Sequence, residues 1–141
     1  MIALDANLLV YAHRSGYAEH VAALRAVEKA RGSRRGWGIP ASAAAEFYSV
    51  VTHPASVGRP SGPEEAQAFL ESLRDAGAKV LYPREGFVER LMQVASDLGI
   101  KGRRIFDLQI ALTAFESGAS EIWTHNRNFV SLPGLPARDP L

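Results

Sequence analysis

The chain has 141 residues and a mass of 15.3 kDa, which suits a single domain over residues 1–141 built around one hydrophobic core. Hydrophobic residues at 47% and charged residues at 22% exclude a disordered or fibrous class. The lack of Cys excludes disulfides, thiolate zinc sites and cysteine catalysis. A net charge of +1 neither requires nor excludes a nucleic-acid partner. No apolar run approaches the roughly 20 residues of a membrane span, and no basic leader opens the chain, so we expect a cytosolic protein without membrane contact.

Short apolar runs alternate with helical patterns along the chain. Strands are predicted at 2–4, 37–39, 79–82 and 121–124, with one more short edge strand near 135–138. Helices are predicted at 8–13, 18–30, 42–52, 64–75, 87–98 and 107–117, the first of them capped by Asn7. Residues 53–63 contain three prolines and two glycines and are expected to form a loop. Strands separated by helices predict an α/β fold in three layers, with a central parallel sheet of four to five strands and helices on both faces.

Three carboxylates stand where an ordinary domain would place apolar residues or a simple turn. Asp5 directly follows the first predicted strand. Glu46 shares the apolar stripe of its helix with Phe47, and Asp107 shares another with Ile110. An ionised carboxylate that points inward costs several kcal/mol unless a cation or hydrogen-bond donors compensate it. Three such groups on separate elements predict a shared site, near the carboxyl ends of the strands, where ligands bind in parallel α/β folds.

Oxygen ligands without Cys or clustered His suit Mg²⁺ or Mn²⁺ rather than zinc. These ions keep several waters, so two or three carboxylates are enough, and their usual chemistry is the hydrolysis of phosphate esters. Each acid also has a simpler interpretation. Asp5 could form a turn, Glu46 could lie on a helix surface, and Asp107 could stabilise the first turn of its helix.

Four ordered segments resemble the motifs of a known family. The opening MIALDANLLVYAH at 1–13 resembles the start of a PIN domain. The segment from Ile39-Pro40 through Glu46-Phe47 to VVTHP at 50–54 resembles the second acidic motif of VapC-type toxins, and FDLQIA at 106–111 resembles the third. THNRNF at 124–129, with the ending from PGL to DPL, is similar to the last. The resemblance spans essentially the whole chain, in order.

This resemblance implies a PIN-like α/β fold with a Mg²⁺ or Mn²⁺ site and endoribonuclease activity. It also implies that the chain is the toxin of a type II toxin–antitoxin pair. Its partners would then be an RNA substrate (tRNA, rRNA or mRNA), a small antitoxin protein and a second copy of the chain in a homodimer. The sequence names neither the RNA nor the antitoxin.

Carried over by position, the resemblance implies a set of site residues. The acidic metal site would be Asp5, Glu46 and Asp107, with Asn126 as a further catalytic position and Asn7 and Thr124 in support. The family often carries a fourth acid in its last motif, whereas this chain has Asn126 and Asn128 there. A neutral amide is a poorer ligand than a carboxylate, which leaves open whether one or two metals bind.

Three further side chains could contact substrate. Arg103 and Arg104 come just before Asp107, where they could meet a phosphate, and His125 adjoins the site.

A phosphorelay receiver domain is a poor match because Asp5 stands alone after the first strand, and a dinucleotide-binding module would need a glycine-rich turn there. The main alternative is a PIN-fold binding protein that has lost nuclease activity.

Overall fold

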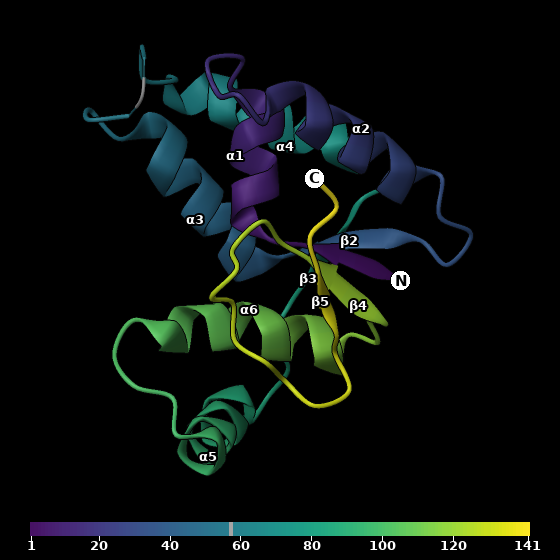
Figure 1. Cartoon of the computed structure of the whole chain (residues 1–141), viewed down its shortest axis with the longest axis vertical. Helices are drawn as coiled ribbons and strands as arrows, with labels where there is room; N and C mark the ends of the chain where they lie inside the picture. The colour runs from purple at the N-terminus through teal and green to yellow at the C-terminus, as the bar shows by residue number, and fades with distance from the viewer. Residues whose placement is uncertain (57) are drawn as a thin grey trace.

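A five-stranded parallel sheet forms the centre of the computed structural model, which describes residues 1–56 and 58–141 (Figure 1). The strand order is β3-β2-β1-β4-β5, and every neighbouring pair runs parallel. The strands are β1 (Ile2–Leu4), β2 (Trp37–Pro40), β3 (Lys79–Leu81), β4 (Glu121–Trp123) and β5 (Ala137–Arg138). The predicted fold class and all five predicted strands are therefore confirmed.

In the part of the chain that the structure describes, six helices cover the two faces of the sheet, as the alternating pattern predicts. In Figure 1, α1, α2 and α4 lie above the sheet, whereas α5 and α6 lie below it. Helix α3 packs against α1, α4 and α6, so it joins the two layers at one end of the sheet. The helices are α1 (Ala6–His13), α2 (His20–Arg31), α3 (Ala41–Thr52), α4 (Pro63–Asp75), α5 (Phe87–Leu98) and α6 (Arg104–Glu116). Part of the loop expected at 53–63 lies outside the described residues, at position 57.

The central strands are short and almost wholly buried, because helices cover both of their faces. Leu4 of β1 and Ile39 of β2 are buried, and both tryptophans, Trp37 and Trp123, lie in the core. Gly38 lets β2 and β3 approach closely, since a Cβ at this position would lie 2.9 Å from the Lys79 carbonyl oxygen. Within the described chain, no helix is long and apolar enough to cross a bilayer.

Two helix starts differ from the sequence prediction. Helix α1 begins at Ala6, and its N-cap is Asp5, whose Oδ1 accepts a hydrogen bond of 2.7 Å from the Ala6 N–H. The predicted cap, Asn7, was therefore wrong, because the carboxylate that ends the strand also starts the helix. Helix α6 begins at Arg104, so Asp107 lies in its first turn rather than opening it.

Candidate functional site

Asp5 is a buried carboxylate held by donors from two neighbouring strand ends. The parallel pairing of β1 with β4 sets Leu4 opposite Trp123, so the residues that follow both strands meet at one edge of the sheet. There Thr124 Oγ1 donates a hydrogen bond of 2.7 Å to Asp5 Oδ2. Desolvation raises the pKa of Asp5, and this effect outweighs the hydrogen bonds from Thr124 and Ala6, which lower it. The charge of Asp107 also raises the pKa, so Asp107 lies within electrostatic reach of Asp5.

Asn7 and Thr124 both donate hydrogen bonds to Asp5. The Asn7 amide nitrogen lies 3.1 Å from both Asp5 Oδ2 and Thr124 Oγ1, to which it donates. Its amide oxygen accepts from the backbone N–H of His125 at 3.2 Å. The two residues therefore tie α1 to the segment after β4 and fix the orientation of the carboxylate.

Asp107 and Glu46 approach the same region from α6 and α3. Asp107 is partly buried, and desolvation raises its pKa, with Arg104 opposing the shift. Burial of the Glu46 carboxyl group raises its pKa, and the charges of Asp5 and Asp107 add to that rise. The charge of Asp107 thus acts on both Asp5 and Glu46, and the charge of Asp5 acts on Glu46, so the three acids lie in one region of the protein.

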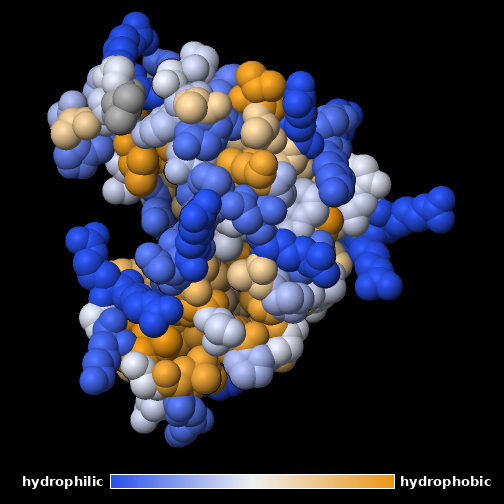
Figure 2. All heavy atoms as spheres, viewed as in Figure 1, coloured by the Kyte–Doolittle hydropathy of each residue, from blue (hydrophilic) through white to orange (hydrophobic). Residues whose placement is uncertain are grey.

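The inward placement predicted for Glu46 was wrong. Phe47 is fully buried in the core, whereas Glu46 as a whole residue is solvent-exposed and only its carboxyl end loses water. Adjacent residues on a helix point about 100° apart, so Glu46 lies at the border of the buried stripe. The molecular surface is hollowed between the region of α3 and the beginning of α6, and hydrophilic residues flank the hollow (Figure 2).

The segment after β4 folds back on itself through Asn126. The Asn126 Oδ1 accepts a hydrogen bond of 2.9 Å from the Asn128 N–H, and its own N–H donates to Thr124 Oγ1. The amide oxygen that we considered as a site ligand is thus already engaged in a turn. Arg104 donates to the Asn128 carbonyl at 3.3 Å, which joins the turn to α6, while Arg103 is exposed at the N-cap of α6.

His125 makes a contact that the sequence did not indicate. Its Nδ1 lies 2.8 and 3.0 Å from the two carboxylate oxygens of Asp139, near the C-terminus. The ring also packs edge-on against Tyr11, with the ring centroids 5.9 Å apart. No spacing in the sequence predicts the His125–Asp139 pair, because it forms only when β5 returns beside β4.

The carboxylate oxygens at this site are suitable ligands for a hard cation that keeps part of its water shell. In the described residues, no three His, Cys, Asp or Glu side chains are close enough to hold an ion by direct contact alone. Asp5 already accepts three hydrogen bonds. Mg²⁺ is commonly bound by one or two carboxylates plus several waters, so Asp5, Glu46 and Asp107 fit Mg²⁺ or Mn²⁺ and not a closed zinc site.

Comparison with known proteins agrees with this arrangement. The model of the PIN domain family matches residues 2–135. The chain belongs to the PIN-domain family. Within this family it is a VapC-type protein: VapC ribonuclease Mb2897 of Mycobacterium bovis is 32% identical over 142 residues, covering 100% of this chain and 96% of the relative.

Solved structures of PIN-domain proteins share the fold. VapC20 of Mycobacterium tuberculosis, described as a sarcin–ricin loop cleaving toxin, has a TM-score of 0.70 at 12% identity, covering 92% of both chains. VapBC2 of Rickettsia felis, solved with a DNA fragment from its promoter, also has a TM-score of 0.70, at 20% identity, covering 99% of this chain and 98% of that chain. At these identities the likeness concerns the fold alone.

Proposed function

We propose that this PIN-domain protein is a Mg²⁺- or Mn²⁺-dependent endoribonuclease that acts as the toxin of a type II toxin–antitoxin system. The observation that carries the proposal is the convergence of three carboxyl groups with raised pKa values from three separate elements, at the carboxyl ends of β1 and β4. VapC-type relatives that are similar over the full length of the chain are named as ribonucleases, which supports the same activity.

The three acids would hold the ion together with water. When bound, the ion activates a water molecule and neutralises charge on the leaving oxygen of a phosphodiester. Asp5 brings the most rigid carboxylate, since Thr124, Asn7 and the N-terminus of α1 fix both of its oxygens. Glu46 and Asp107 are less buried and have more freedom to adjust to the ion.

We propose RNA as the substrate because its phosphates are negatively charged and two arginines lie near the site. The charge of Arg104 opposes the rise in the pKa of Asp107, and its side chain anchors the turn at Asn128, while Arg103 is exposed beside it. Both can meet phosphates of a bound strand. An RNA substrate of any of the three classes, tRNA, rRNA or mRNA, places the activity in the cytoplasm.

An RNase of this kind needs a restraining partner, and we propose a small antitoxin chain. The R. felis relative of known structure is a VapBC2 complex. A cation blocks an acidic site most directly, so an antitoxin Arg or Lys among Asp5, Glu46 and Asp107 would replace the metal electrostatically.

We further propose a homodimer formed through the apolar faces of α5 and α6. Large hydrophobic side chains are exposed there, and Figure 2 shows hydrophobic residues gathered over the lower part of the molecule, where these helices lie. The exposed side chains are Val88, Met92 and Leu98 on α5 and Phe106 and Phe115 on α6. Exposed large apolar side chains on two neighbouring helices are typical of an interface between copies of a chain.

Cleavage of RNA tests the proposed activity. Purified protein incubated with total bacterial RNA should produce discrete fragments with Mn²⁺ and none in excess EDTA, and Asp107→Asn should abolish the products. Asp97→Asn, which removes an exposed charge from α5, is the matched control and should cleave normally. Undiminished cleavage in EDTA would contradict the metal mechanism. Binding of RNA without any cleavage would favour the alternative, a PIN-fold binding protein without nuclease activity.

A further inference from the structure

The C-terminal tail carries a carboxylate that no part of the proposed reaction uses. We infer that Asp139 is a positioning residue, which holds the imidazole of His125 beside the acidic site so that the ring can contact a phosphate of bound RNA. The inference rests on the proposed function, because the phosphate belongs to the RNA substrate.

The sheet itself brings Asp139 to this place. Strand β5 pairs with β4, Trp123 lies opposite Arg138, and the Thr124 N–H donates to the Arg138 carbonyl at 2.9 Å. Asp139 directly follows β5 and therefore lies beside the segment after β4 that supports Asp5. Its Oδ1 also accepts a hydrogen bond of 3.0 Å from the Leu141 N–H, so the carboxylate is held from its own side as well.

His125 is restrained on three sides. Asp139 accepts from Nδ1, Tyr11 packs against the edge of the ring, and Asn7 accepts from the backbone N–H. Asn7 in turn donates to Asp5, so the histidine is two hydrogen bonds away from the buried acid of the site. This chain of contacts ties the backbone at His125 to the buried acid of the site.

The pairing with a carboxylate also determines which ring nitrogen is left for substrate. An ionised carboxylate only accepts hydrogen bonds, so Nδ1 carries the proton that Asp139 accepts. A phosphate oxygen also only accepts, so contact with RNA needs a second proton on the ring, and Nε2–H is then the donor that points to the phosphate. Across residues 1–56 and 58–141, no protein group pairs with Nε2. A solvent-facing contact between a histidine and a carboxylate adds little to folding stability, so holding the ring in one orientation is the better account of the contact.

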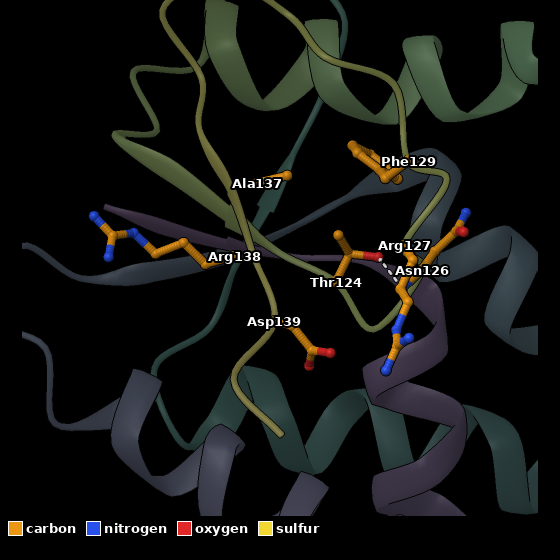
Figure 3. Close-up of a pocket in the computed structure, with 7 residues that line it drawn as sticks. All are labelled: Thr124, Asn126, Arg127, Phe129, Ala137, Arg138 and Asp139. Atoms are coloured by element: carbon orange, nitrogen blue, oxygen red, sulfur yellow. Dashed lines mark hydrogen bonds between the residues drawn. The ribbon is translucent and has the colours of Figure 1, made fainter.

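The charges around Asp139 keep it in its anionic form. Desolvation alone would raise the pKa of Asp139, but hydrogen bonds from His125 and Leu141 and the charges of His125 and Arg127 outweigh it, so the pKa is lowered. Figure 3 shows Asp139 and Arg127 at a small pocket that Thr124 also lines. This pocket, of about 180 Å³, separates the tail from the turn at Asn126.

The test compares Asp139→Asn with His125→Ala and with the double variant. The substrate is an RNA oligonucleotide that spans a cleavage site mapped in total bacterial RNA. Asp139→Asn keeps the side-chain volume and an acceptor for Leu141 but loses the charge that orients the ring. We expect either single variant to raise KM by about fivefold to tenfold, with kcat within about twofold of wild type. The double variant should be no worse than His125→Ala, because Asp139 acts through the histidine.

A spectroscopic measurement keeps the inference testable without activity. Nitrogen NMR of the metal-free protein should show the proton on Nδ1 of His125 in the wild type, and a shift toward the Nε2–H tautomer in Asp139→Asn. Asp97→Asn should change neither the spectrum nor KM. The inference would be overturned if Asp139→Asn raised KM by the same factor in the His125→Ala background as in the wild type. It would also be overturned if wild-type His125 carried its proton only on Nε2. Absence of RNA cleavage by the wild type would instead count against the proposed function, and the tautomer would still report on the positioning.

Discussion

At the scale of single residues, Asp5 combines a structural and a chemical task. One carboxylate oxygen caps α1, and the other accepts from Thr124 and Asn7. These donors make burial of the charge tolerable, while desolvation still keeps the pKa raised. A sequence shows that an acid follows a strand, but it does not show which donors will surround it.

Thr124→Val tests the support of Asp5. The change removes the hydroxyl that donates to the buried carboxylate at nearly constant volume, so we expect a loss of about 1–3 kcal/mol in the free energy of unfolding, measured in urea near neutral pH. Thr52→Val is the control, since the Thr52 hydroxyl donates to the Tyr48 carbonyl in the exposed last turn of α3 and has no other hydrogen bond among the residues that the structure describes. Equal losses for both variants would show that the Thr124 hydroxyl has no special role.

The raised pKa of Glu46 predicts how stability depends on pH. Because the folded protein holds this proton more tightly than the unfolded chain, the stabilisation is full below the ordinary value of 4.5 and is lost as pH rises through the raised value. Glu46→Gln should therefore raise the melting temperature of the metal-free protein by about 1–3 °C at neutral pH and have less effect in mild acid. Glu71→Gln on the exposed face of α4 is the control. A melting temperature lowered by Glu46→Gln would contradict the proximity of the acids.

At the scale of elements, the sequence predicted the sheet well because its strands are short buried runs bounded by clear breaks. All five strands and six helices lie where the patterns placed them, within a few residues. The exposure of Glu46 was not predicted, because it depends on how α3 is rotated about its own axis. The cap at Asp5 was not predicted either, because periodicity does not fix the first residue of a helix. The pairing of His125 with Asp139 depends on how the tail docks, which local patterns do not encode.

Gly38→Ala tests the close approach of β2 and β3. The new methyl group would meet the Lys79 carbonyl oxygen and the Leu81 side chain, each at 2.9 Å, so the strands would have to move apart. We expect a loss of about 1–3 kcal/mol in the free energy of unfolding. Gly16→Ala is the matched control, because a Cβ there meets nothing within 4 Å. A Gly38 variant as stable as the control would mean that the sheet is less tightly packed than described.

At the scale of the whole molecule, α6 takes part both in the acidic site and in the exposed apolar surface. Its first turn carries Asp107, and Phe106 next to it is exposed, as are Val88 and Met92 on α5. If these side chains form the proposed dimer, Met92→Glu should shift the protein from dimer to monomer in light scattering after size exclusion, since a charge would be buried at the interface. Gln93→Glu, one position away on α5, should remain dimeric. A dimer that survived Met92→Glu would place the interface elsewhere.

The central claim is that Asp5, Glu46 and Asp107 share one metal ion, and titration of the protein with Mn²⁺ by calorimetry tests it most directly. Carboxyl groups with raised pKa values must lose their bound protons to solvent before they can ligate the ion, so binding should release protons and strengthen as pH rises from mild acid to neutral. We expect Glu46→Gln and Asp107→Asn each to weaken Mn²⁺ binding by about tenfold or more, while Glu71→Gln binds as the wild type does. Mn²⁺ affinity unchanged by both site variants would contradict the claim.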